Sequence, residues 1–246
     1  MKLNKKLRKF LNSFLDILFP GNCPICDGEA YKDGLSYMCV ECEGTLAWIK
    51  KNGCKYCGIP MSGYDFNGLT CAACRNDQPS FRKGKCMFLL DQNGKKVVHE
   101  IKYFGVKNIL DDMPSWLGRC PSYRTFLEGS VLIPVPLHKK RFSKRGFNQS
   151  MWIANAFRNE LGKDVNISEV LTRTRDTPTQ TKLDRSKRKR NVKNAFVINK
   201  KNTLNKSDRI VLVDDVYTTG ATLNECAKTL IAEGFENVNV ATLGHG

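Results

Sequence analysis

Four C-x-x-C pairs near the N-terminal end constrain this chain more than any other feature of its sequence. A C-x-x-C turn supplies two thiolates from one short stretch of backbone, and zinc at structural sites prefers four such ligands in a tetrahedron. The pairs contain eight of the eleven cysteines: Cys23, Cys26, Cys39, Cys42, Cys54, Cys57, Cys71 and Cys74. The spacing therefore predicts two closed, non-catalytic zinc sites in a metal-stabilised module over residues 21–78.

The spacing leaves the pairing of these cysteines open. Two successive sets of four, over residues 23–42 and 54–74, would resemble a double zinc ribbon. In an interleaved arrangement, the first pair would share a metal with the third. Iron–sulfur ligation and free buried cysteines are the alternatives to zinc, and the regular pairing disfavours free cysteines. Paired thiolates imply a reducing compartment, so we predict a cytoplasmic protein.

Composition indicates one sizeable core and a strongly basic surface. The chain has 246 residues, of which 41% are hydrophobic, and its formal net charge is +16. Such a length supports one main core with a small appendage. Positive charge favours polyanionic partners such as nucleic acid, phosphorylated metabolites or anionic lipid, although a solvated basic surface gives the same balance. The sequence contains no apolar run of about 18 residues, which predicts no transmembrane segment.

Residues 1–20 have the pattern of an amphipathic helix. The apolar residues that form its expected face recur at helical spacing: Leu7, Phe10, Leu11, Phe14 and Leu18. We expect this helix to pack on the core of the chain. The alternative is peripheral contact with anionic lipid at the inner face of the membrane.

From about residue 80 the pattern changes to alternating strands and helices. Strands are expected at residues 86–91, 131–135, 195–198, 209–214 and 238–243, and helices at residues 95–119, 148–161 and 222–233. Strands separated by helices of this length indicate βαβ units. The sequence therefore predicts an α/β domain over residues 80–246, with a parallel sheet flanked by helices.

The segment RIVLVDDVYTTGATL, residues 209–223, carries the chemistry of a binding site. Asp214 and Asp215 end an aliphatic strand, where open α/β sheets bind their ligands. Hydroxyls and backbone N–H groups at the start of the following helix form a cradle for phosphate. Acidic side chains beside such a cradle suit sugar hydroxyls or a cation, so the segment predicts a ribose phosphate site. The structural alternative is a capped helix that follows a strand.

The same segment resembles the PRPP-binding motif of type I phosphoribosyltransferases. The resemblance implies that Asp214 and Asp215 are the catalytic acidic pair and hold the ribose hydroxyls, with Mg²⁺ accompanying PRPP. It also implies that the 5-phosphate is bound by Thr218, Thr219, Gly220, Ala221 and Thr222. Purine-salvage members that use an acidic general base place it where this chain has Thr218. The motif therefore indicates PRPP binding more firmly than catalysis.

Two basic segments occur where that fold contacts pyrophosphate. The first follows the strand at residues 131–135, and the resemblance implies a pyrophosphate loop containing Lys139, Lys140, Arg141, Lys144 and Arg145. The second, residues 172–196, corresponds to the long flexible catalytic loop, with Thr177, Gln180, Arg185 and Arg188 as candidates for phosphate contact. A disordered basic surface loop is the alternative for residues 182–190. Residues 80–120, including Lys102 and Lys107, are expected to form the hood over an acceptor.

Several motifs occur in one order: V-P-V-P-L-H…R-G-F-N-Q, R-D-T-P-T-Q-T, R-x-x-N-V-x-x-A-F and LVDDVYTTGATL. Together with the cysteine pairs that precede them, they resemble the ComF competence-protein family. That resemblance implies a double zinc ribbon joined to a type I phosphoribosyltransferase-like domain. It also implies a role in natural competence, handling incoming single-stranded DNA with the DNA-uptake machinery.

These features support hypotheses from different classes. The first is a PRPP-dependent phosphoribosyltransferase, either in competence or in nucleotide salvage, with an unidentified acceptor. The second is a non-catalytic module that grips single-stranded DNA. Basic residues at 139–145 and 182–193 would contact phosphates, with Phe142, Phe147 and Trp152 as stacking rings. A zinc-mediated docking protein is a third, and it leaves the PRPP motif without a role.

Overall fold

The computed structural model describes residues 22–30, 37–50, 53–61, 69–177, 185–199 and 204–246. The strands are β1 (Gly84–Leu89), β2 (Val131–Pro134), β3 (Asn166–Ile167), β4 (Leu171–Arg173), β5 (Phe196–Ile198), β6 (Ile210–Tyr217) and β7 (Val238–His245). The α-helices are α2 (Val40–Gly44), α3 (Ala72–Asn76), α4 (Gln92–His99), α5 (Met113–Arg119), α6 (Pro121–Leu127), α7 (Lys139–Arg145), α8 (Gln149–Leu161), α9 (Arg185–Val192) and α10 (Ala221–Ala232). A π-helical turn, η1 (Glu100–Phe104), and two 3₁₀ segments, η2 (Lys107–Asp112) and η3 (Gly162–Asp164), complete the set.

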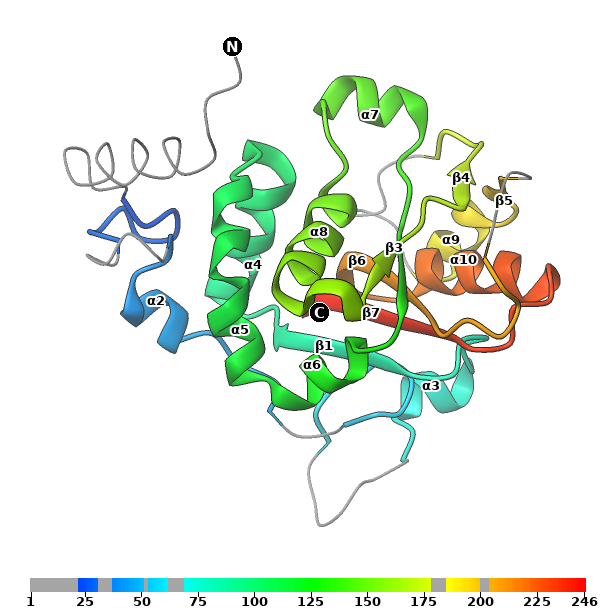
Figure 1. Ribbon diagram of the computed structural model, residues 1–246, viewed down its shortest axis with the longest axis horizontal. Helices are drawn as coiled ribbons and strands as arrows, with labels where there is room; N and C mark the ends of the chain where they lie inside the picture. The colour runs from blue at the N-terminus through cyan, green and yellow to red at the C-terminus, as the bar shows by residue number, and fades with distance from the viewer. Residues whose placement is uncertain (1–21, 31–36, 51–52, 62–68, 178–184, 200–203) are drawn as a thin grey trace.

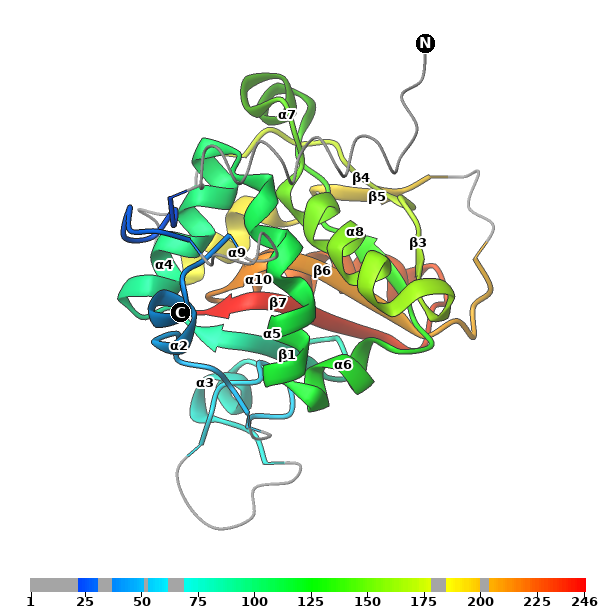
Figure 2. The same ribbon diagram turned by 60° about the vertical axis from the view of Figure 1, so that its left-hand side comes forward.

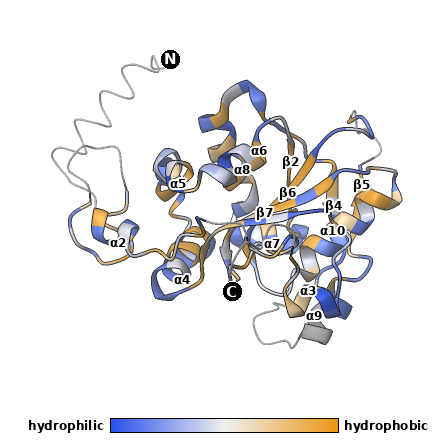
Figure 3. Cartoon of the chain, turned by 90° about the horizontal axis from the view of Figure 1, so that it is seen from below, coloured by the Kyte–Doolittle hydropathy of each residue, from blue (hydrophilic) through white to orange (hydrophobic). Residues whose placement is uncertain are grey.

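Five strands form a parallel sheet in the order β1-β7-β6-β2-β3. The sheet lies at the centre of the molecule, with helices in front of it and behind it (Figure 1). Its strands are mostly apolar (Figure 3), as expected for parallel strands that are covered on both faces. The predicted α/β class with a parallel sheet and a small cysteine-rich module is therefore confirmed.

Alternation along β6 divides the core into two layers. Val211 and Val213 pack with α4, α5, α6 and α8 on one face, because successive side chains of a strand point to opposite sides. Ile210 and Leu212 pack with α10 and the β4–β5 hairpin on the other face. The two views of the ribbon show the same division (Figures 1 and 2). The carboxyl end of β6 is thus held between two buried layers.

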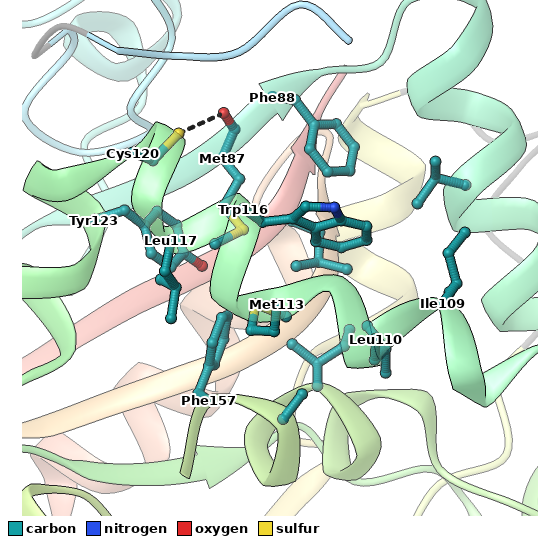
Figure 4. Packing of buried hydrophobic residues seen from close by; sticks show 14 of the residues in the cluster. Met87, Phe88, Ile109, Leu110, Met113, Trp116, Leu117, Cys120, Tyr123 and Phe157 are labelled. Carbon is teal, nitrogen blue, oxygen red and sulfur yellow. Dashed lines mark hydrogen bonds between the residues drawn. The ribbon is translucent and has the colours of Figure 1, made fainter. Parts of the chain in front are cut away.

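Aromatic packing anchors α5 to the edge of the sheet. Trp116 is fully buried, and its ring lies 6.2 Å from those of Phe88 on β1 and Trp48. Figure 4 shows Trp116 among the side chains of β1, α5 and α8. Nearby, the Cys120 thiol donates a hydrogen bond to the Met87 carbonyl at 3.6 Å. Trp48 therefore joins the segment after the first cysteine set to the main core.

The cysteine module does not form a core of its own. Cysteines of the first set pack into the layer that contains α4, α5 and α8, together with Met38 and Leu46. Cysteines of the second set pack into the opposite layer, with Phe81 and Tyr217. The two halves of the module therefore brace opposite faces of one sheet, which the sequence pattern did not predict.

Several local elements differ from their expected form. The helix expected over residues 95–119 is divided into α4, η1, η2 and α5, because Gly105 adopts φ 68° and ends the turn that precedes it. Helix α7 occupies a segment that was expected to be a loop, and it ends at Gly146 with φ 82°. Strand β5 forms as expected, but it pairs antiparallel with β4 outside the parallel sheet.

Two predictions fall wholly or partly outside the described residues. They are the amphipathic helix at residues 1–20 and, within the basic segment predicted at residues 172–196, residues 178–184. Among the helices of the described ranges, none combines the length and hydropathy needed to cross a membrane.

Candidate functional site: an acidic pair beside a phosphate cradle, and two cysteine clusters

A cavity of about 610 Å³ opens at the carboxyl ends of β2 and β6. It brings together side chains from the α4–η1 segment, α7, α8, β4 and the loop between β6 and α10. Its lining includes Lys102, Tyr103, Arg141, Lys144, Arg145, Gln149, Arg173, Asp214, Asp215 and residues 218–222. All the residues predicted for the PRPP motif and three of the five predicted for the pyrophosphate loop therefore share one cavity.

The acidic pair lies at the floor of this cavity. Asp214 accepts hydrogen bonds from the Ser150 hydroxyl at 2.8 Å and from the backbone N–H of Asp215 at 2.9 Å. Asp215 is 3% exposed, and its Oδ2 lies 2.8 Å from the Lys102 ammonium. One carboxylate is thus hydrogen-bonded by the protein, and the other carries its own counter-charge.

Burial changes the proton affinity of this pair. It raises the pKa of Asp214 to about 7, and the neighbouring charge of Asp215 adds to the effect, whereas Lys102 and Ser150 oppose it. Burial by itself would lower the pKa of Lys102, but the charge of Asp215 and their hydrogen bond outweigh it and raise that pKa. Asp214 can therefore carry a proton near neutral pH while Lys102 stays charged.

The raised pKa of Asp214 predicts a pH dependence of stability. Between pH about 4 and about 7 the folded protein holds a proton that the unfolded chain has lost. The free energy of unfolding should therefore fall as pH rises through this window, by on the order of a few kcal/mol. In Asp214→Asn this contribution disappears, so the variant should exceed the wild type in stability at pH 7 and above.

Urea unfolding of both proteins between pH 4 and pH 8 measures this difference. Asp112, whose pKa is raised to about 6 mainly by burial, contributes the same slope to both proteins and cancels. Parallel stability profiles for the wild type and Asp214→Asn would contradict the prediction.

The cradle follows β6 directly. Gly220 adopts φ 69° as the N-cap of α10, and its carbonyl accepts the first helical hydrogen bond, from Asn224 N–H at 2.8 Å. The Thr219 hydroxyl accepts a hydrogen bond from Ala221 N–H at 3.4 Å. The positive end of a twelve-residue helix, with threonine hydroxyls beside it, therefore faces the cavity.

Three arginines, Arg141, Arg145 and Arg173, line the same cavity. Arg173 is 6% exposed, and its Nε has no hydrogen-bond partner among the described residues. Arg173 donates to the Thr177 hydroxyl, and Arg141 donates to the Thr177 carbonyl at 2.8 Å. Arg145 donates to the Gln149 side chain. Within the described ranges, these guanidinium groups form no ion pair, so they are suited to binding an anion.

Some predicted site residues lie elsewhere. Lys139 and Lys140 are exposed and do not line the cavity. The Lys140 ammonium instead lies 3.7 Å from the Asp176 carboxylate. Thr177 is buried, does not line the cavity, and accepts hydrogen bonds from the cavity residues Arg141 and Arg173. Gln180 is outside the described residues. Arg185 and Arg188 belong to α9, whose basic first turns are described for the backbone only.

The structure also adds residues that the motif did not indicate. Arg173, Gln149 and Tyr103 line the cavity although they come from three separate elements. Of the two predicted hood lysines, Lys102 reaches the acidic pair, whereas Lys107 lies beside a different hollow. Arg173 lies within the predicted loop at residues 172–196, two residues before the R-D-T-P-T-Q-T motif, but it was not among the residues named for phosphate contact.

The residues of this cavity do not fit a resident Mg²⁺ ion. Such an ion prefers hard oxygen ligands in octahedral geometry. The cavity offers two carboxylates, of which Asp215 is already paired with Lys102 and Asp214 accepts two hydrogen bonds from the protein. Among the described residues, groups of three or more potential metal ligands occur only at the cysteines. The lysine therefore supplies the positive charge at this acidic pair.

The eight paired cysteines form two clusters of four. One contains Cys23, Cys26, Cys39 and Cys42, and the other Cys54, Cys57, Cys71 and Cys74, with the sulfurs of each set within 4.8 Å of one another. This is the sequential pairing, not the interleaved one. Sulfur–sulfur distances of 3.7 Å occur in both sets, and a tetrahedron with Zn–S bonds of about 2.3 Å requires about 3.8 Å. The geometry supports two structural zinc ions.

Each cluster is attached to one wall of the cavity. In the first, Asp112 accepts hydrogen bonds from the backbone of Tyr37 at 2.8 Å and Met38 at 2.9 Å, and Lys96 donates to the Ile25 carbonyl at 3.1 Å. Lys96 lies on α4, which continues into the turn that carries Lys102. The first cluster therefore supports the Lys102 wall.

The second cluster supports the phosphate cradle. Phe81 lies edge-on to Tyr217, 6.4 Å between ring centroids, and Tyr217 directly precedes the cradle. Ser80 N–H donates to the Asn224 side chain on α10 at 2.6 Å. Both cysteine sets are thus linked to the cavity through short chains of contacts.

The chain is similar to several known proteins along most of its length. It is 31% identical over 227 residues to the DNA utilization protein YhgH of Shigella flexneri, covering 90% of this chain and 95% of that protein. It is 28% identical over 228 residues to competence protein F of Haemophilus influenzae, covering 83% of this chain and 95% of that protein. It is 25% identical over 236 residues to competence protein ComFC of Bacillus subtilis, covering 86% of this chain and 89% of that protein. The double zinc ribbon domain family matches residues 14–75.

Proposed function

Because this chain belongs to the ComF family of competence proteins, we propose that it binds PRPP or another ribose 5-phosphate and acts in natural competence on incoming single-stranded DNA. One observation carries the first part of this proposal. A buried acidic pair, a helix N-terminus with threonine hydroxyls, and three arginines without ion-pair partners among the described residues line the same cavity. A cytoplasmic location with DNA-uptake proteins or the membrane nearby belongs to the same proposal.

The residues divide the ligand among three groups. Asp214 and Asp215 accept hydrogen bonds from the ribose hydroxyls, and the backbone of residues 218–222 binds the 5-phosphate. Arg141 and Arg173 neutralise a diphosphate on the C1 side. In a phosphoribosyl transfer, the unidentified acceptor would form a bond to C1 while the C1–O bond to pyrophosphate breaks, and pyrophosphate would leave toward these arginines. Because Thr218 offers no general base, the proposal is that the site binds PRPP, and it does not extend to catalytic turnover. Any Mg²⁺ would be bound by the diphosphate of the ligand.

Calorimetry with ribose 5-phosphate and with PRPP tests this proposal. We expect the wild type to bind both ligands, with PRPP tighter because only PRPP reaches the arginines. The double variant Asp214→Asn/Asp215→Asn should lose at least about tenfold in affinity, because amides accept hydrogen bonds from hydroxyls less strongly than carboxylates do.

Asp164→Asn is the matched control, since Asp164 is exposed in η3 and does not line the cavity. Its affinity should equal that of the wild type. Wild-type protein that binds neither ligand, or binding that survives in the double variant, would refute the proposal.

Single-stranded DNA is a second candidate ligand, favoured by α7. This seven-residue helix has no buried residue, and five of its residues are basic. Phe142 on α7 is 48% exposed. Phe147 and Trp152 stack on each other with their ring centroids 3.9 Å apart, and both are only partly exposed. Of the three rings expected to stack on bases, Phe142 is therefore the most accessible.

Fluorescence anisotropy with a labelled oligothymidine, measured across a salt series, tests this candidate. Lys139→Ala/Lys140→Ala should weaken DNA binding. The slope of log K against log salt concentration should become less steep by about 0.7 for each phosphate contact that is lost. Affinity that is independent of salt, or unchanged in this variant, would exclude α7 as the DNA contact. Lys163→Ala, at an exposed position of η3, is the control.

A further inference from the structure

Two consecutive aromatic side chains, one of which lines the cavity, are unusually exposed. Phe104 is 68% and Tyr103 is 55% exposed, the two largest values among the exposed large hydrophobic residues of the described chain. Both belong to the π-helical turn η1, a rare conformation that is frequent at functional sites. Tyr103 lines the cavity. A scattered surface aromatic needs no explanation, but an exposed ring in the wall of a binding cavity does.

Contacts on both sides hold this turn in place. Lys102, the residue before Tyr103, forms the 2.8 Å ion pair with Asp215 and so attaches the turn to the acidic pair. Gly105, which ends the turn, packs so closely on Phe147 that an added Cβ would lie 3.1 Å from its ring. Tyr103 is therefore positioned next to the acidic pair although its ring is open to solvent.

The surroundings of Tyr103 suit a flat, electron-rich ligand. The Arg145 guanidinium lies 5.7 Å from the Tyr103 ring centroid and 6.0 Å from that of Phe147. The His99 ring lies 4.8 Å from Tyr103 and 5.3 Å from Phe104. Aromatic and guanidinium planes are the groups on which nucleobases stack, and every base offers a face for stacking.

We propose that Tyr103 forms a stacking subsite for a nucleobase, placed on the C1 side of a ribose 5-phosphate held by the acidic pair and the cradle. This inference rests on the proposed function. The base belongs either to a mononucleotide in the cavity or to a single-stranded DNA chain that crosses its mouth. Phe104, which is outside the cavity lining, extends the surface in the second case.

Calorimetry with matched ligands tests the subsite. AMP and UMP share the phosphate and ribose of ribose 5-phosphate and add only the base. Stacking on one aromatic ring corresponds to about 5- to 150-fold in affinity, so we expect AMP to bind about tenfold tighter than ribose 5-phosphate. Tyr103→Ala should reduce AMP affinity to that of ribose 5-phosphate and leave ribose 5-phosphate binding unchanged.

Two further variants separate stacking from a structural effect. Tyr103→Phe keeps the ring and should keep the AMP preference, whereas Tyr103→Leu keeps apolar area without a ring and should lose most of it. In anisotropy with oligothymidine, Phe104→Ala should weaken DNA binding if a DNA base is the ligand, and it should leave AMP binding intact.

The outcomes distinguish this inference from the function on which it rests. If ribose 5-phosphate binds and AMP binds no tighter, the subsite is refuted and the proposed function stands. If Tyr103→Leu retains the full AMP preference, the ring does not act by stacking and the inference is again refuted. If ribose 5-phosphate itself does not bind, both proposals are overturned.

Discussion

Removal of zinc should unfold the whole protein, including the sheet. The two cysteine clusters pack into the two core layers that cover opposite faces of the sheet, so neither forms an independent appendage. Structural zinc sites contribute roughly 10–16 kcal/mol of apparent binding free energy, while domains of this kind are stable by about 5–15 kcal/mol. Loss of either ion therefore removes much of the total stability.

Single ligand substitutions measure each cluster separately. Cys42→Ser and Cys74→Ser should each reduce bound zinc from two ions to one per chain and lower the melting temperature by about 10 °C or more. Metal analysis by mass spectrometry and thermal melting by circular dichroism provide the readouts. Cys74→Ser should also weaken ribose 5-phosphate binding, because its cluster supports the cradle through Phe81 and Tyr217.

Cys226→Ala is the matched control for these variants. Cys226 is fully buried but lies outside both clusters, so the variant should keep two zinc ions. Protein that melts cooperatively at an unchanged temperature after complete chelation would contradict the structural role of zinc.

Gly220→Ala should strongly weaken ribose 5-phosphate binding and destabilise the fold. Gly220 has φ 69°, and an added Cβ would overlap the Tyr217 ring, with Cε2 at 2.8 Å. Tyr217 cannot move away, because it is 5% exposed and packs against Phe81 and His245. The start of α10 must shift instead. Loss of one hydrogen bond from the shifted cradle to the charged phosphate is expected to cost roughly 10- to 150-fold in affinity, and the strain about 3 kcal/mol in stability.

Gly129→Ala separates the two sources of strain. Gly129 has φ 66°, nearly the same as Gly220, but an added Cβ would meet nothing within 4 Å. This variant should cost only about 1–2 kcal/mol, from the left-handed backbone alone, and should bind ribose 5-phosphate normally. Chemical denaturation and calorimetry on both variants provide the comparison. Equal losses in the two variants would show that close packing on Tyr217 is unimportant.

Residues that belong to the site through local sequence were predictable. The segment over 209–223 places an aliphatic strand, two carboxylates and a threonine–glycine turn in immediate succession, and each step follows from backbone chemistry. The structure brings Asp214, Asp215 and residues 218–222 into one cavity as expected. Resemblance to the ComF family is confirmed by relatives that cover most of the chain.

Residues that reach the site from distant elements were harder to predict. Lys102 was expected in the hood, but its ion pair with Asp215 depends on a π-helical turn that no periodicity indicates. Helix α7 was missed because its sequence has no apolar stripe, and it forms without burying a single residue. The His138 side chain and Gly146 cap its two ends.

The sequence by itself therefore determined the α/β class, the eight metal ligands and the acidic pair beside its cradle, because these depend on spacing along a few residues. Only the tertiary structure decided that the cysteines pair sequentially, that their clusters brace opposite faces of the sheet, and that Lys102, Arg173 and Tyr103 meet at the cavity. These arrangements depend on how separate elements pack around the end of β6. Packing is a property of the whole fold, which no local pattern encodes.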